Sequence, residues 1–178
     1  MRTYLLLAAT LLCGCAGATD VNSGRKTYTG PYSATFVEST VSTSLQGGGT
    51  FPCTNTYTMT GILTMTIGPN DRSTVGTAQI DGVQTETAHS SGDSCKAKGN
   101  LSTVWSPTLT GTTTDLHFAE QNVATNGTYV VTSKATFAGT LSGGVITGVL
   151  GFSVLGTGTI GTTSGVQSYS TTMNVVLQ

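Results

Sequence analysis

From Tyr28 to the C-terminus, apolar and polar residues alternate with a period of two. The clearest run is residues 57–67, in which threonines occupy most positions of one parity. The apolar residues of the other parity are Tyr57, Met59, Leu63, Met65 and Ile67. This pattern predicts an antiparallel strand with one face in the core and a hydroxyl-bearing outer face. Residues 129–141 and 169–177 repeat it.

The first expected strand changes phase along its length. Apolar residues occupy even positions up to Phe36 and odd positions from Val41 to Leu45. An extra residue in one strand moves the following side chains to the other parity. The sequence therefore predicts a β-bulge near Glu38-Ser39.

Glycine-rich turn signals separate the extended runs, as expected for hairpins. They are Gly47-Gly48-Gly49, Gly68-Pro69-Asn70-Asp71, Asp81-Gly82, Asn126-Gly127 and Gly143-Gly144. Of these, Asp81-Gly82 could instead form a bulge within one long strand. The glycine-rich segment 156–165 has no following Lys and opens no helix, which excludes a phosphate-binding loop.

These runs predict an all-β fold with eight or nine strands in a single antiparallel meander. An up-and-down β-barrel is favoured over a β-sandwich, because no long crossover connection is needed. A membrane-spanning barrel also alternates, but it requires girdles of aromatic residues. Aromatic residues make up only 7% of this chain.

Charged residues are scarce, at 8% of the 178 residues. The chain has seven Lys and Arg residues and eight Asp and Glu residues. Loss of Arg2 with a leader would leave six against eight, a net charge of −2. Nucleic-acid partners are not expected, because they require basic clusters. The single Trp, Trp105, is interpreted as a core residue, with lining of a ligand cavity as the alternative.

The N-terminus has the features of a secretory signal. A charged start is followed by an apolar run, 4–12, that is too short to span a bilayer. Leu12-Cys13-Gly14-Cys15 then resembles the lipobox of bacterial lipoproteins. The alternative cleavage site is Ala16-Gly17-Ala18, and a cut after Ala18 would release a soluble secreted or periplasmic protein.

The lipoprotein resemblance implies that residues 1–14 are a signal peptide and that Cys15 is lipidated. Residues 15–27 would then be the lipidated Cys15 with a flexible tether, because the residues after Cys15 are small and polar. Residues 28–178 are the all-β domain that the period of two predicts. In that family the cysteine carries a diacylglycerol and its amino group is often acylated, for example with palmitate. Because Ala16 rather than Asp follows Cys15, the resemblance implies a cell-envelope protein held in the outer membrane by its lipid anchor.

The remaining cysteines, Cys53 and Cys95, are predicted to form one disulfide, as is usual in an exported chain. Such a bond would contribute about 4 kcal/mol in the chain-entropy model. A metal pair or a reactive thiol is the alternative, but either needs a CxxC motif or a histidine cluster. Neither is present.

Candidate catalytic residues are few. Asp115 and His117 share an outer strand face, which suits either a solvated ion pair or a dyad seeking a Ser nucleophile. No G-x-S-x-G motif supplies that Ser. His89 near Asp93 lacks further metal ligands. The scattered carboxylates do not specify a glycosidase pair; they are Glu38, Asp81, Glu86 and Glu120.

No catalytic residue, metal site or cofactor is therefore predicted. We expect a non-enzymatic binding module, with a small apolar ligand inside the barrel or a partner on its surface. The alternatives are a structural or adhesive module presenting Thr-rich faces, and a hydrolase using His117. The ligand hypothesis requires a cavity, because an eight-stranded barrel can also be filled by its own side chains.

Overall fold

A computed structural model describes residues 24–68, 76–89 and 100–178. These residues form nine strands and no helix, and none of them forms a helix that could cross a membrane. The strands are β1 (Lys26–Ser44), β2 (Thr50–Ile67), β3 (Gly76–His89), β4 (Leu101–Trp105), β5 (Thr108–Thr112), β6 (Asp115–Asn126), β7 (Tyr129–Ser142), β8 (Val145–Ile160) and β9 (Thr163–Leu177).

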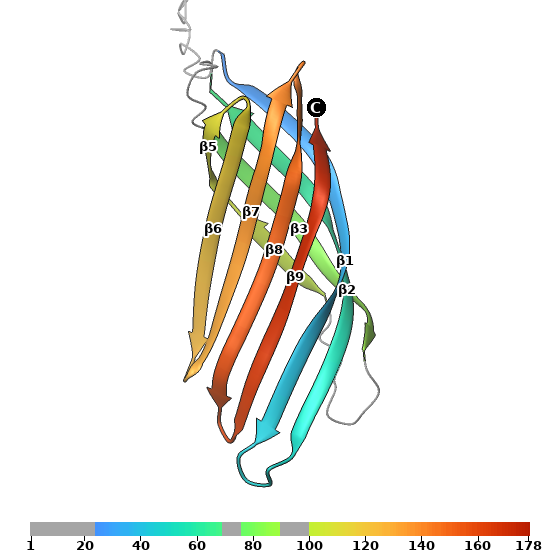
Figure 1. The fold of residues 1–178 in the computed structure, drawn as a ribbon, viewed down its shortest axis with the longest axis vertical. Coiled ribbons are helices and arrows are strands. Elements are labelled where there is room, and N and C mark those ends of the chain that lie inside the picture. The colour runs from blue at the N-terminus through green and yellow to red at the C-terminus, as the bar shows by residue number, and fades with distance from the viewer. Residues whose placement is uncertain (1–23, 69–75, 90–99) are drawn as a thin grey trace, which may run out of the picture.

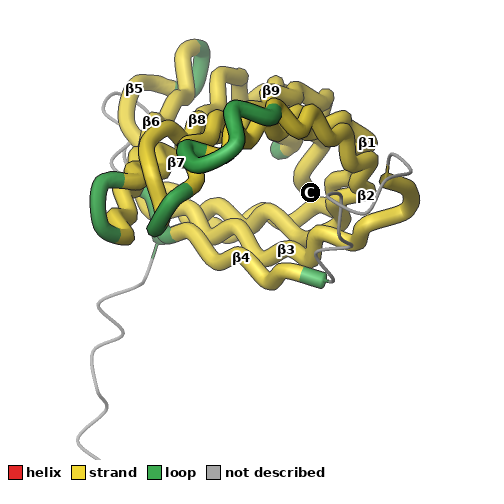
Figure 2. The backbone as a smooth tube through the Cα atoms, turned by 90° about the horizontal axis from the view of Figure 1, so that it is seen from below, coloured by secondary structure: helices red, strands yellow, loops and turns green. Residues whose placement is uncertain are grey.

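The nine strands form one antiparallel meander that closes into a ring, as Figures 1 and 2 show. Their order is β2-β1-β9-β8-β7-β6-β5-β3-β4, and pairing of β2 with β3 completes the ring. The predicted all-β meander is confirmed. The ring is uneven, because β4 and β5 both pair with β3 and are separated at Ser106-Pro107.

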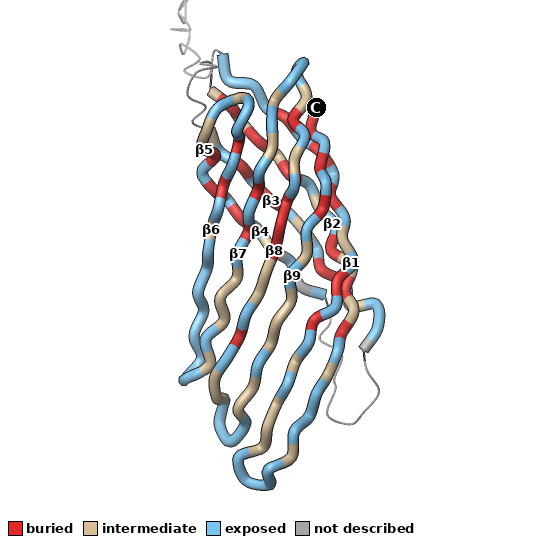
Figure 3. The backbone as a smooth tube through the Cα atoms, viewed as in Figure 1, coloured by how far each residue is buried: buried red, intermediate tan, exposed pale blue. Residues whose placement is uncertain are grey.

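One hydrophobic core fills the upper half of the ring, the end at which β1 begins and β9 ends. Figure 3 shows the buried positions concentrated there. The apolar residues predicted in 57–67 all belong to this core and are at most 4% exposed. Phe137 and Phe152, which also point inward, are 2% and 5% exposed. The period-two prediction is therefore confirmed for these strands.

Asp81-Gly82 is neither a turn nor a bulge, so both predictions for it were wrong. The β2–β3 register runs through it without a shift, with Gly61 opposite Gly82. The Tyr32 ring lies over this glycine pair, and its hydroxyl donates to the Asp81 carbonyl at 3.2 Å. A Cβ on Gly82 would lie 2.1 Å from the Tyr32 hydroxyl oxygen. These glycines leave room for an aromatic ring instead of marking a turn.

The predicted hairpin turn at Gly143-Gly144 is confirmed, whereas the turn predicted at Asn126-Gly127 lies one residue further on, at Gly127-Thr128. Gly143 and Gly144 have φ of 59° and 81°, as a type I′ turn requires. Asn126 ends β6, and Gly127 begins the two-residue turn with φ 62°. Residues 47–49 lie in the β1–β2 connection. The signal at 68–71 falls largely outside the described residues.

The predicted bulge at Glu38-Ser39 was wrong. β1 pairs with β2 without a register shift from Lys26 to Thr43. Glu38 continues the inward face and is 2% exposed, whereas Val41 and Leu45 point outward with 38% and 61% exposure. The apolar residues change parity because the inward face of β1 becomes polar below Phe36.

Candidate functional site

The change from apolar to polar side chains occurs on the inward faces of four strands. Below the core, β1, β2, β3 and β9 each carry a polar residue in place of the next apolar one. We call this set the polar layer; its members are Glu38, Asn55, Gln84 and Gln167. The first three are 2%, 3% and 6% exposed. Because buried polar groups are costly without partners, their contacts decide what this layer does.

Hydrogen bonds join three members of the polar layer across the ring. Asn55 Nδ2 donates to the Tyr57 hydroxyl at 3.2 Å, and that hydroxyl donates to Glu38 Oε2 at 3.4 Å. Gln167 Nε2 donates to Glu38 Oε1. The Tyr129 hydroxyl donates to Gln167 Oε1 at 3.5 Å. The chain of bonds runs from β2 through β1 and β9 to β7, and it fixes the side chains below the core.

Burial of phenol groups around this layer raises their pKa values. Burial, with smaller contributions from the charges of Glu38 and the neighbouring Tyr57, raises the pKa of Tyr169 to about 12. Burial is also the main reason that the pKa values of Tyr57 and Tyr129 are raised. Phe36 stacks on Tyr169 with ring centroids 4.3 Å apart. These tyrosines are therefore neutral at physiological pH, and Tyr57 and Tyr129 act as hydrogen-bonding groups.

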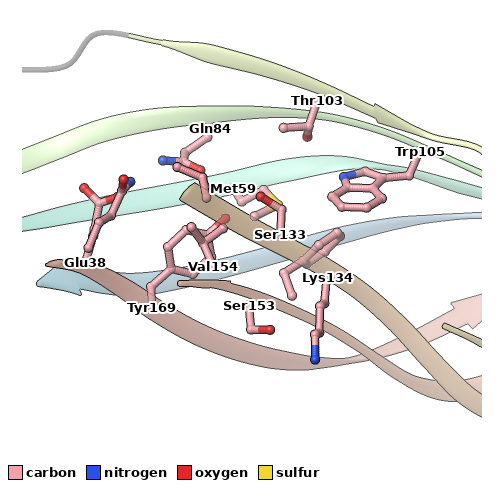
Figure 4. A pocket seen from close by; sticks show the side chains of 13 residues that line it. Glu38, Met59, Gln84, Thr103, Trp105, Ser133, Lys134, Ser153, Val154 and Tyr169 are labelled. Atoms are coloured by element: carbon pink, nitrogen blue, oxygen red, sulfur yellow. The ribbon is translucent and has the colours of Figure 1, made fainter. Parts of the chain in front are cut away.

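A cavity of about 160 Å³, which we call the chamber, lies between the core and the polar layer. Its apolar wall includes Met59, Trp105 and Phe152, and its polar wall includes Gln84 and Gln167. Figure 4 shows Glu38 and Trp105 at opposite ends, with Met59, Ser133 and Tyr169 between them. The Lys134 ammonium points away from the group. The chamber thus has one apolar end and one hydrogen-bonding end.

Trp105 belongs to the hydrophobic core, as predicted, and is 8% exposed. It also lines the chamber. As the only Trp of the chain, it is a natural reporter of the chamber.

Asp115 and His117 lie on the outer face of β6, as predicted. His117 Nδ1 is 3.6 Å from Asp115 Oδ1, and their side chains are 50% and 76% exposed. Thr110 Oγ1 donates to the main-chain oxygen of His117 at 3.0 Å, not to its ring. Within the described residues, no hydrogen bond joins the His117 imidazole to a hydroxyl. The geometry is that of a solvated pair on a strand.

The other candidate residues are spread over the molecule. His89 ends β3, while Asp93 lies outside the described residues. Glu38 and Glu86 both act on Tyr57 through their charge. Asp81 accepts a hydrogen bond from Gln79 Nε2 at 2.8 Å on the outside. In the described parts of the chain, no group of three or more His, Cys, Asp or Glu could hold a metal ion.

Cys53 lies in β2, opposite Thr40 of β1. Cys95 lies outside the described residues, so the predicted Cys53–Cys95 disulfide remains a prediction. The lipobox, including Cys15, also lies outside them, as does the alternative site at Ala18.

Comparisons with protein-family models, with curated proteins and with solved structures gave no match.

Sequence reasoning did not identify the polar layer as a site. In the sequence, Glu38 stands out as a scattered carboxylate and as the position of the predicted bulge, and nothing marks Asn55, Gln84 or Gln167. The sequence does contain a signal: after an apolar strand face, a polar residue follows at the next position of the same parity, as Glu38 follows Phe36. Read without a structure, that signal resembles a bulge.

Proposed function

We propose that the protein is a non-enzymatic binding module whose chamber holds a small, mostly apolar molecule. The observation that carries this proposal is the cavity of about 160 Å³ between the core and the polar layer. Apolar cavities of about 150 Å³ admit benzene, whereas drug-sized ligands occupy about 300–1,000 Å³. The chamber therefore suits a ligand of benzene size or slightly larger.

The two ends of the chamber indicate the chemistry of the ligand. Met59, Trp105 and Phe152 offer a hydrocarbon surface, on which an apolar body gains from leaving water. Gln84 and Gln167 at the other end offer amide groups. A small ring or short chain that carries one hydroxyl or amide group would match both ends.

Titration with cyclohexanol tests this proposal, with Trp105 fluorescence as the readout. We expect a saturable change in emission and weaker binding of cyclohexane, which lacks the polar group. Val154 lines the chamber, and Val154→Phe should fill it and abolish the saturable change. The matched control is Leu155→Phe, since the neighbouring Leu155 is 54% exposed on the outside. No saturable change in the unsubstituted protein would favour the structural or adhesive alternative.

We further propose that Cys15 carries a lipid anchor and that the protein belongs to the bacterial cell envelope, in the outer membrane. The support is the resemblance of Leu12-Cys13-Gly14-Cys15 to a lipobox. Intact mass of the membrane-extracted protein tests this: a diacylated or triacylated N-terminal Cys15 is expected. A mature chain that starts at unmodified Thr19 would refute the anchor.

A further inference from the structure

The lower part of β6 has a strand neighbour on one side only. β5 pairs with β6 at three positions, the last being Thr110 opposite His117. Below His117, β6 pairs among the described residues only with β7. All residues from Gln121 to Asn126 are exposed, on both faces of the strand. Figure 1 shows this part of β6 as the border of the molecule.

Hairpin geometry identifies which main-chain groups face this open edge. The two-residue turn closes on the pair Asn126–Tyr129, and hydrogen-bonded pairs alternate with non-hydrogen-bonded pairs along an antiparallel ladder. Asn126 and Ala124 therefore bond to β7. The N–H and C=O groups of Gln121, Val123 and Thr125 point away from β7.

From Gln121 to Asn126, this edge lacks the features that normally protect an edge strand. Natural edges carry charged residues, Pro or a bulge that discourages pairing with another chain. Residues 121–126 contain no charged residue and no Pro, and the β6–β7 register has no shift along them. A second strand can therefore add to β6 without disturbing the ring.

We propose that this edge pairs with the same edge of a second copy of the chain. An antiparallel arrangement with its twofold axis at Val123 places Val123 opposite Val123, and Gln121 opposite Thr125. Such pairing forms about six main-chain hydrogen bonds. Residues 121–126 carry no charge and Glu120 faces Asn126, so no like charges meet.

The self-complementarity of the edge is what favours a second copy over an unrelated strand. An isologous contact uses the same patch on both subunits and closes after two. Val123 is 56% exposed and packs against its own counterpart across the axis. The dimer then carries one sheet that continues from one ring into the next.

A charge-swap experiment tests the twofold axis at Val123. The full chain is examined by sedimentation velocity over a range of concentrations, and a dimer is expected. Val123→Lys and Val123→Glu should each be monomeric, because like charges would lie directly opposite across the axis. An equimolar mixture of the two variants should dimerise again. A monomeric unsubstituted chain, or a mixture that stays monomeric, would overturn the proposal.

Val123→Pro tests the backbone pairing independently of charge. The Val123 N–H faces the open edge, so Pro removes a donor to the second copy while the bonds from β6 to β7 remain. We expect dimerisation to weaken roughly 30-fold or more, because two main-chain hydrogen bonds are lost. The control is Val149→Lys, since Val149 is 44% exposed on β8, which is paired on both sides. If Val149→Lys dissociates the dimer equally, the interface lies elsewhere.

Discussion

Alkaline pH should destabilise this protein through Tyr32, which is buried, and Tyr169, which is partly buried against the core. Burial, with a smaller contribution from the Asp81 charge, raises the pKa of Tyr32 to about 12, and the pKa of Tyr169 is also about 12. The usual value is 10.0. Below pH 10 the tyrosines are neutral in both the folded and unfolded states, so no stability is lost. As the pH rises from 10 to 12, the unfolded chain releases their protons first and the folded state loses stability.

The size of the effect follows from the two pKa values. At pH 11, a tyrosine with a pKa of 10 unfolded and about 12 folded lowers the free energy of unfolding by about 1.4 kcal/mol. Tyr32 and Tyr169 together therefore account for about 2–3 kcal/mol between pH 8 and pH 11. Tyr57 and Tyr129, whose pKa values are also raised, add to this loss.

Urea unfolding at pH 8 and pH 11 measures this loss, with a Tyr32→Phe/Tyr169→Phe double variant as the comparison. Phe retains the stacking of residue 169 on Phe36 and has no proton to release. Titration of other groups affects both proteins alike. The double variant should lose about 2–3 kcal/mol less than the unsubstituted protein. Equal losses in the two proteins would show that these phenols are not shielded as described.

Four further substitutions test the packing and one turn. Leu63→Ala should lower the free energy of unfolding by about 2–5 kcal/mol, because Leu63 is fully buried. Ile62→Ala should lower it far less, because Ile62 is 45% exposed. Similar losses for both variants in urea unfolding would contradict the assigned strand faces. Gly148→Ala should cost about 1–3 kcal/mol in the same assay, since its Cβ would lie 2.5 Å from the Phe137 ring; an unchanged midpoint would contradict this contact. Gly143→Ala, at φ 59° in open space, should cost about 1–2 kcal/mol from backbone strain alone, and thermal unfolding checks it.

The strand faces could be predicted from the sequence where apolar side chains mark the inside. Leu63 and its neighbours in β2 follow the period of two because the core surrounds that face. The same rule failed at Glu38, because an inward face that becomes polar looks like a change of phase. It also failed at Asp81-Gly82, since a glycine under an aromatic ring resembles a turn glycine.

The chamber could not be predicted from the sequence for a related reason. Its walls come from strands far apart in the chain, such as Met59 on β2, Trp105 on β4 and Gln167 on β9. Only the register of the closed ring brings these side chains together. No local pattern records that register.

The most direct test of the binding proposal is a search for intermolecular nuclear Overhauser effects from cyclohexanol to methionine methyl groups. Met59 lines the chamber, while Met65 is fully buried in the upper core. Binding in the chamber predicts contacts from the ligand to the Met59 methyl group and none to Met65. Absence of contacts to Met59 at saturating cyclohexanol would contradict the proposal that the chamber is the binding site.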